Sequence, residues 1–264
     1  MTLTPETGSA MTHAADSLAP AYRPDLRQPA AVRERVLRRV VELGLVSGLA
    51  IDVGCGDGAT TASLAAAIPG RPVLGVDISP AMIDEAIARF GDRADFAVGT
   101  FERMPAESSS AALITAVNMW HLVGDRDEAF REARRVVRPR GLVAIVGALR
   151  EDLAVQTIHR LFPVFHRASA RRHQSGPELT ATAARAGLTP VLFETVDFEV
   201  TLGLPAQVIE LVAEKPFFDM RLMAGADFDD GFEEFRREIS TLPADEVVTT
   251  PSRCSVVVFR VGEE

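Results

Sequence analysis

The stretch that decides the fold is IDVGCGDG, residues 51–58. A short apolar run, predicted to be a strand ending near Asp52, leads into it, and an alanine-rich segment predicted to be a helix follows it. The glycines allow a tight turn and let a ligand approach the backbone closely. Turns of this kind, at a helix N-terminus and at the carboxyl edge of a parallel sheet, bind cofactors, so we expect an adenosine-containing ligand here.

The same alternation of strands and helices continues on both sides of this turn. Apolar residues at helical spacing predict an amphipathic helix over residues 29–45, and Ser79 followed by Pro80 predicts the start of a later helix. Further strands are predicted at residues 72–79, 95–98, 111–117 and 142–148, with helices over residues 79–90 and 124–141. Strands and helices that alternate with short turns indicate a parallel sheet covered by helices, an α/β fold.

Beyond residue 150 the pattern becomes mostly helical. Residues 151–187 and 205–240 are predicted to be largely helical, and two strands are predicted at residues 190–200 and 252–261. No repeat or low-complexity linker divides the chain.

We therefore predict a single domain with helical insertions behind a flexible N-terminal segment. The segment is residues 1–28, the domain is residues 29–264, and the lid insertions lie at about residues 150–187 and 203–245.

Composition excludes several kinds of partner. The 264 residues include 28 Lys and Arg against 37 Asp and Glu, a net charge of −9, so a nucleic-acid backbone is not an expected partner. The longest apolar run, residues 141–149, is much shorter than the roughly 20 residues of a membrane helix. Cys55 and Cys254 are too few for a disulfide framework, so we expect a cytoplasmic protein without nucleic-acid or membrane partners.

The glycine-rich turn alone leaves two cofactor classes open. Gly54, Gly56 and Ala59 also satisfy the dinucleotide pattern GxGxxA, with Asp77 about 20 residues further on as the acid for the ribose. By this motif alone the protein is equally a candidate nicotinamide-dependent enzyme. Asp52, two residues before the first glycine, and the order of the later segments distinguish the two classes.

The segment DVGCGDG resembles the first motif of the class I S-adenosylmethionine-dependent methyltransferases, and the resemblance extends in order over roughly residues 22–261. The segments that resemble later motifs of the family are LGVDIS (74–79), VGTFERMP (98–105), AVNMWHL (116–122) and RRVVRPRGLVAI (134–145). The resemblance is to the small-molecule, type 11/25-like subfamily. It implies a doubly wound, Rossmann-like sheet of seven strands, mostly parallel with an antiparallel last strand.

The resemblance implies S-adenosyl-L-methionine as the cofactor and S-adenosyl-L-homocysteine as the product. The glycines of the turn would face the methionine and ribose, Asp52 the amino group, and Asp77 the two ribose hydroxyls, since a carboxylate accepts from two hydroxyls at once. The complete cofactor-binding set that it implies is Tyr22, Arg27, Asp52, Gly54, Cys55, Gly56, Gly58, Asp77, Ile78, Met82, Thr100, Phe101, Glu102 and Asn118.

Several members of this set leave alternatives open. Thr100 stands where the family commonly has an acid that accepts from the adenine amine, and neighbouring Glu102 is a candidate substitute. Met82 fits either an adenine contact or the core. Tyr22 either covers the sulfonium or caps the domain. Cys55 is expected to be a small buried side chain rather than a nucleophile, since no histidine or acid partner can be placed beside it.

The acceptor side is predicted from position in the chain. His121 follows the strand at residues 111–117, at the edge where the methyl group should lie. It is therefore the candidate general base, with packing against a neighbouring helix as the alternative. Trp120 beside it is either a pocket wall or core. The candidate acceptor-binding residues are Trp120, His121, His159, Phe162, His166 and Phe217.

A metal site is not expected. His159, His166 and His173 are spaced by seven residues, which would place them on one face of a continuous helix, but Pro163 interrupts that helix. Neither an HxxxH pair nor a supporting cysteine accompanies them. We expect a histidine-lined acceptor pocket or a proton relay instead, with His173 on a solvated face.

The sequence thus predicts an S-adenosylmethionine-dependent methyltransferase that acts on a small-molecule acceptor. O-methylation of a hydroxyl or a carboxyl group, in natural-product or small-acid metabolism, is the first hypothesis. The alternatives are N- or C-methylation and a non-methylating reaction on the same fold, such as a cyclisation. A non-catalytic regulatory subunit also stays open, and we expect a monomer or a homodimer.

Overall fold

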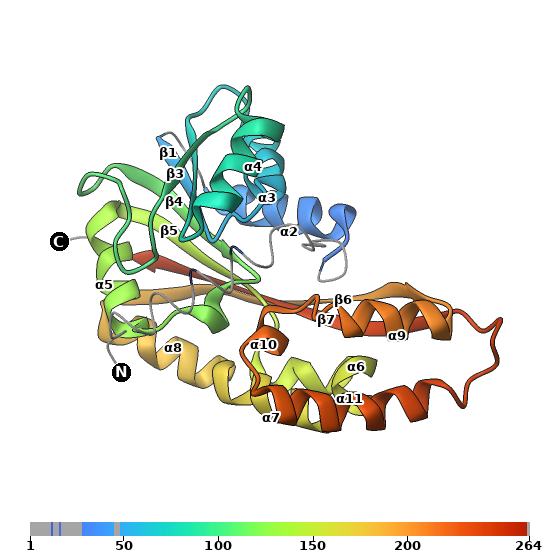
Figure 1. Ribbon diagram of the computed structural model, residues 1–264. Coiled ribbons are helices and arrows are strands. Elements are labelled where there is room, and N and C mark those ends of the chain that lie inside the picture. The colour runs from blue at the N-terminus through green and yellow to red at the C-terminus, as the bar shows by residue number, and fades with distance from the viewer. Residues whose placement is uncertain (1–11, 13–15, 17–27, 45–47, 263–264) are drawn as a thin grey trace.

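The computed structural model describes residues 12, 16, 28–44 and 48–262, and a twisted seven-stranded sheet lies at its centre (Figure 1). The strands are β1 (Leu49–Val53), β2 (Val73–Asp77), β3 (Asp95–Val98), β4 (Ala111–Val117), β5 (Val137–Gly147), β6 (Leu188–Gly203) and β7 (Val248–Val261). Their order across the sheet is β3-β2-β1-β4-β5-β7-β6. The first five strands pair in parallel, and β7 runs antiparallel to β5 and β6, which confirms the predicted fold class.

The chain reverses its direction across the sheet after β3. From β1 it winds outward through β2 and β3, and it then returns to place β4 on the other side of β1. The carboxyl ends of β1 and β4 therefore border the switch point, which is where doubly wound sheets bind their ligands. The glycine-rich turn after β1 and the short helix η3 (Trp120–Leu122) after β4 both lie at this edge.

Side chains that alternate along the strands build two separate cores, one on each face of the sheet. On one face, Val36 and Leu37 of α2 (Ala30–Glu42) and Leu64 of α3 (Ala59–Ala67) pack against the sheet. On the other face, Phe130 of α5 (Arg126–Val136) and Leu179 of α8 (Gly176–Arg185) do so. Helix α8 falls within the predicted first insertion, but it covers the sheet.

Helix α4 (Pro80–Phe90) begins where the sequence predicts. The hydroxyl of Ser79 accepts a hydrogen bond from the backbone N–H of Met82 at 3.1 Å, and Pro80 occupies the first helical position, where its missing N–H costs nothing. Both features fix the point at which the chain leaves β2 and turns back along the sheet.

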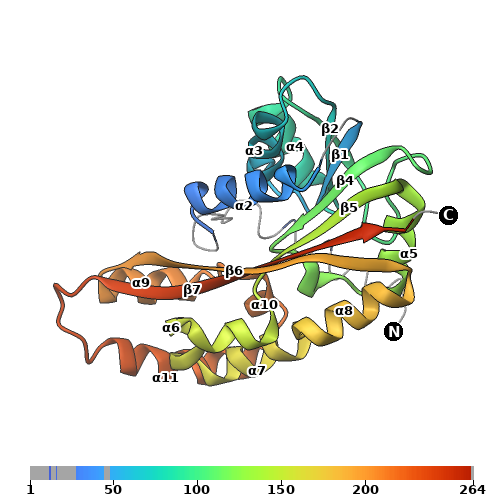
Figure 2. The same ribbon diagram turned by 180° about the vertical axis from the view of Figure 1, so that it is seen from behind.

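The remaining helices form a second body of structure, here called the helical layer (Figure 2). Its members are η4 (Arg150–Val155), α6 (Thr157–Leu161), α7 (Pro163–Arg172), α9 (Pro205–Ala213), α10 (Phe218–Arg221) and α11 (Gly225–Ile239). All of them except η4 share a phenylalanine-rich core, which includes Phe162, Phe165, Phe228 and Phe235. Both predicted insertions contribute to this one core.

The last two strands are longer than predicted, because they pair with each other beyond the sheet. β7 contacts β5 only from Ser255 onward, whereas its pairing with β6 extends back to Val248 opposite Gly203. The result is a two-stranded ribbon that projects from the sheet toward α9 and α11 (Figure 2). Within the described part of the chain, no helix combines the length and the apolar character needed to cross a membrane.

Candidate functional site

The glycine-rich turn after β1 has a backbone that only glycine adopts without strain. Gly54, Gly56 and Gly58 have φ angles of +70°, +54° and +82°, all in the left-handed region. A Cβ atom at Gly54 would also lie 2.6 Å from Cγ of Met119. The turn is therefore held close against the segment that follows β4.

Asp77, at the end of β2, faces this turn. Its Oδ2 accepts from the backbone N–H of Gly56 at 2.9 Å, and its Oδ1 accepts from the backbone N–H of Ser79 at 3.0 Å. Burial raises the pKa of Asp77, and the backbone N–H groups of Ser79, Gly56 and Ile78 oppose that rise. Backbone donors therefore orient the carboxylate toward the turn, and an ionised carboxylate can accept further hydrogen bonds from a ligand.

The Asp52 carboxylate is hydrogen-bonded to two neighbouring elements of the fold. Its Oδ2 accepts from the hydroxyl of Thr61 on α3 at 2.8 Å, and its Oδ1 accepts from the hydroxyl of Thr115 on β4 at 2.9 Å. Desolvation raises the pKa of Asp52 to about 6, although both threonine hydroxyls act in the other direction. The side chain thus ties β1 to two neighbours, and its predicted contact with an amino group stays a prediction.

The turn after β3 carries the two residues considered for the adenine contact. Oε1 of Glu102 accepts from the backbone N–H groups of Gly124 and Asp125 at 3.1 and 3.3 Å, so this oxygen helps to fix the start of α5. The use of Glu102 as a substitute for the missing acid stays a prediction. Thr100 forms a tight backbone pair with Arg103, and its adenine contact stays a prediction.

Other members of the predicted cofactor set lie in or near the core. Cys55 is buried, and burial raises the pKa of its thiol, which agrees with the expectation of an unreactive side chain. Met82 is also buried, Phe101 packs edge-on against Trp120, and Ile78 is half-buried. Tyr22 and Arg27 lie outside the described residues, as does most of the predicted flexible segment 1–28.

A pocket opens between the edge after β4 and the helical layer. Asn118, with a φ of +54°, and His121 line its sheet side, while His159, Phe165, Phe217 and Asp219 line its helical side. Arg253 also lines it, and its guanidinium is paired with the Asp197 carboxylate at 2.6 and 3.1 Å. Phenylalanine rings, imidazoles and one carboxylate therefore line the pocket. The cation that lines it, Arg253, is already paired with a carboxylate.

Two histidines of this pocket are held neutral by burial. Desolvation lowers the pKa of His159 to about 3, its ring stacks on Phe165 at 4.6 Å, and its Nδ1 has no hydrogen-bond partner among the described residues. His173 was expected on a solvated face, and this expectation is wrong. Only 7% of His173 is exposed, because it ends α7 against the pocket, and its Nδ1 lies 2.8 Å from the Ser169 carbonyl oxygen.

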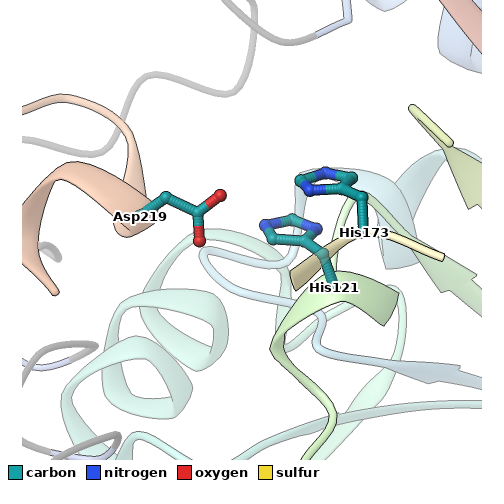
Figure 3. A group of neighbouring side chains, drawn as sticks. All are labelled: His121, His173 and Asp219. Carbon is teal, nitrogen blue, oxygen red and sulfur yellow. The ribbon is translucent and has the colours of Figure 1, made fainter. Parts of the chain in front are cut away.

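Figure 3 shows the group at the centre of this pocket, His121, His173 and Asp219. The two imidazole rings are stacked with centroids 4.4 Å apart and planes 8° from parallel, and one ligand-type atom of each residue lies within 4.8 Å of the other two. The residues come from η3, the end of α7 and α10, so three distant segments meet here.

The structure places one predicted acceptor residue in the core, which was one of its two alternatives, and corrects another. Trp120 belongs to the sheet core, where it packs on Phe130 and donates from Nε1 to Oε1 of Gln174 at 2.9 Å. Phe162 is fully buried in the core of the helical layer and does not line the pocket.

The other acceptor-side predictions agree with the geometry in part. His159 and Phe217 line the pocket, whereas His166 touches it only through an edge-on contact of its ring with His159. Asp219 was missed, because nothing in the sequence distinguishes it from the acids of exposed helix faces around it. Its burial in the helical layer, with only 6% exposed, is a tertiary effect.

Comparison with known proteins gives the class. A family model described as a methyltransferase domain matches residues 51–145. A malonyl-[acyl-carrier protein] O-methyltransferase of Geobacter sulfurreducens is 30% identical over 190 residues, which cover 67% of this chain and 71% of that protein. A protein of the same name from a Methylovorus species is 28% identical, over 64% of this chain and 60% of that protein.

A third relative and two solved structures extend the comparison. The trans-aconitate 2-methyltransferase of Methylobacterium radiotolerans is 37% identical over 43% of this chain and 42% of its own length. A putative sarcosine dimethylglycine methyltransferase from Galdieria sulphuraria shares the fold, with a TM-score of 0.58 and 17% identity over 91% of both chains. A [4+2]-cyclase has a TM-score of 0.58 and 17% identity over 89% of this chain and 82% of its own.

The fold, the glycine-rich turn and these matches define an enzyme of the methyltransferase class. The chain belongs to the class I S-adenosylmethionine-dependent methyltransferases. The nicotinamide alternative, which rested on the glycine motif alone, is therefore set aside. The matched part of the chain spans less than two thirds of several of these relatives.

Proposed function

We propose that this protein transfers the methyl group of S-adenosylmethionine to a hydroxyl group of a small molecule, with His121 as the general base. The observation that carries the proposal is the pocket between Asn118 and the helical layer. It presents imidazoles and phenylalanine rings to an acceptor, and its cation Arg253 is already paired with Asp197.

The cofactor would be held at the carboxyl edge of β1 and β2. The left-handed glycines at residues 54, 56 and 58 let the ligand approach the backbone, and Asp77 presents a carboxylate already oriented by two N–H groups. This arrangement fits a ribose with two hydroxyls, each of which donates to one oxygen. When bound, S-adenosylmethionine supplies a methyl group activated by a positively charged sulfur.

A hydroxyl acceptor needs a base, and His121 is positioned to be one. The hydroxyl oxygen forms a bond to the methyl carbon while the carbon–sulfur bond breaks and its electron pair stays on sulfur. The O–H proton passes to the His121 ring, so the protein gains one positive charge as the sulfur loses one. Proximity and the exclusion of water provide much of the remaining acceleration.

A carboxyl acceptor is the second candidate, favoured by the names of two relatives, which specify a malonyl group and trans-aconitate. A carboxylate needs no base but needs a cation for binding. The pocket favours the hydroxyl, because the Arg253 guanidinium is occupied by Asp197. N- or C-methylation and a cyclisation remain the further alternatives.

The test uses S-adenosylmethionine with a deuterated methyl group and a panel of small alcohols, phenols, amines and carboxylic acids. We expect S-adenosylhomocysteine to form together with a labelled product that survives mild alkali, as a methyl ether does. An alkali-labile methyl ester, a labelled amine or a converted acceptor without S-adenosylhomocysteine would each contradict the proposal.

The role of His121 is tested with the same acceptor. His121→Gln is expected to lower turnover by about 100-fold or more and to remove the rise of the rate with pH that a titrating base causes. His166→Gln is the matched control, since His166 does not line the pocket. An unchanged pH profile in His121→Gln would reject the base and leave the methyl transfer itself intact.

A further inference from the structure

The group in Figure 3 contains more than the proposed base. We infer that Asp219 and His173 are positioning residues for His121: Asp219 supplies the negative charge that stabilises the protonated His121 ring, and stacked His173 stays neutral and holds that ring in place. The inference rests on the proposed function and extends it, because it assigns the partners of the base.

His173 is fixed in one tautomer by its surroundings. Its Nδ1 lies 2.8 Å from the Ser169 carbonyl oxygen, which only accepts, so this nitrogen carries the proton. Desolvation lowers the pKa of His173, and the guanidinium groups of Arg126 and Arg150 lower it further, whereas the Ser169 carbonyl and Asp219 act in the opposite direction. His173 therefore stays neutral beside His121.

The stacking decides which of the two rings takes a proton. Two imidazolium ions cannot share a face-to-face contact with centroids 4.4 Å apart without strong repulsion, so one proton is the limit for the pair. His121 is half-exposed to the pocket, while His173 is buried. The proton from the acceptor consequently goes to His121.

Asp219 lies where its negative charge can stabilise the protonated His121 ring. It lies on the short helix α10, is buried, and its Oδ1 has no hydrogen-bond partner among the described residues. Its ion-pair partner is Arg172, whose Nε lies 3.7 Å from Oδ1. An opposite charge within about 4–6 Å favours the protonated form of a histidine, directly or through one water.

The same three residues would be a donor set for a metal ion, but their geometry argues against one. The lone pair of an imidazole nitrogen lies in the plane of its ring. Because the His121 and His173 planes are only 8° from parallel and stacked, their lone pairs do not meet at one point. A charge-stabilised base fits this arrangement without a change in either ring.

The proposed methyl transfer places a positive charge on His121, and this charge defines the role of Asp219. Methyl transfer removes a positive charge from sulfur and creates one on His121, in a pocket whose other histidines are neutral. Asp219 provides the counter-charge on the side where the new charge appears, with Arg172 as its own ion-pair partner, while Arg126 and Arg150 oppose protonation of the neighbouring His173.

The experiment is a histidine titration of the complete protein by NMR, which is practical because the chain has five histidines. The His121 signal is assigned with His121→Gln. In Asp219→Asn we expect the midpoint of the His121 titration to fall by about 1 pH unit, and in Asp219→Glu, which keeps the charge, to stay near that of the unaltered protein. Asp229→Asn, on the exposed face of α11, is the control.

Two outcomes would overturn the inference. One is an unchanged His121 midpoint in Asp219→Asn with the fold intact by circular dichroism. The other is stoichiometric binding of Co²⁺ or Zn²⁺ that is lost in Asp219→Asn, which would make the group a metal site. Neither readout requires an acceptor, so a failure here is distinguishable from a failure of the proposed O-methylation.

Discussion

Asp52 and Asp77 are buried carboxylates at the ends of neighbouring strands, and their donors separate their roles. Asp52 accepts from the hydroxyls of one threonine on α3 and one on β4, whereas Asp77 accepts from two backbone N–H groups at the edge. The first arrangement braces the fold, and the second presents a charge to the cofactor side. Each leads to a prediction about a single side chain.

Asp77→Ala is expected to weaken the binding of S-adenosylmethionine and S-adenosylhomocysteine by about 1–3 kcal/mol, because charged hydrogen bonds to the ribose are lost. Calorimetric titration measures this loss. Asp84→Ala, on the exposed side of α4, is the matched control and should leave the dissociation constant unchanged. Equal affinities of the Asp77→Ala variant and the unaltered protein would remove Asp77 from the cofactor site.

The raised pKa of Asp52 predicts a pH dependence of stability. Burial raises this pKa from 3.8 to about 6, so between these values the folded state binds more protons than the unfolded state. Stability attributable to Asp52 is therefore highest below about pH 4 and falls as the pH rises toward 6, by up to about 3 kcal/mol.

This dependence is isolated by comparing the unaltered protein with Asp52→Asn in urea denaturation between pH 4 and 7. The free energy of unfolding of the unaltered protein should fall relative to that of the variant as the pH rises. Parallel curves would show that Asp52 keeps an ordinary carboxyl pKa in the folded protein.

At the scale of elements, caps determine where the helices that border the site begin. Asp125 accepts from the backbone N–H of Glu128 at 2.9 Å and starts α5, and Glu102 binds the backbone of the same turn. We expect Asp125→Ala to lower the free energy of unfolding by about 1 kcal/mol, and Asp125→Ser to restore most of that loss. Chemical denaturation tests both; an equal loss in the two variants would exclude a capping role.

The elements that were predictable from sequence are those with local signals. The strand, turn and helix around residues 49–67 follow from apolar runs, glycines and the alanine-rich segment, and α4 follows from Ser79 and Pro80. The start of β7 was not predictable, because Val248 joins a strand only through its partner Gly203 on β6. Pairing between distant residues leaves no mark on either segment alone.

At the scale of the whole molecule, the sheet and the helical layer have separate cores, and the pocket lined by His121 and Asp219 lies between them. Phe162→Ala removes a ring that packs on Gly231 in the helical layer. We expect a loss of about 3–5 kcal/mol, concentrated in α7 and α11 as faster hydrogen exchange. Affinity for S-adenosylmethionine should stay unchanged; a parallel loss would show that the two bodies unfold together.

The cofactor side and the acceptor side of the candidate site differ in how far the sequence could predict them. That the residues proposed for the cofactor lie together was predictable, because they follow strands whose carboxyl ends meet at one edge of a parallel sheet. The acceptor side was not, since His121, His173 and Asp219 come from three separate elements and meet only through tertiary packing. For the same reason Trp120, next to the proposed base in sequence, is part of the core.

The ribbon of β6 and β7 has a consequence for how such an enzyme can change. Both helical insertions are attached at the far end of this ribbon or at its base, and neither interrupts the five parallel strands that carry the cofactor edge. Mutations that remodel the helices can therefore accumulate while the methyl-donor half keeps its geometry. The architecture thus keeps the strands proposed to hold the methyl donor separate from the helices on which selection for a new acceptor can act.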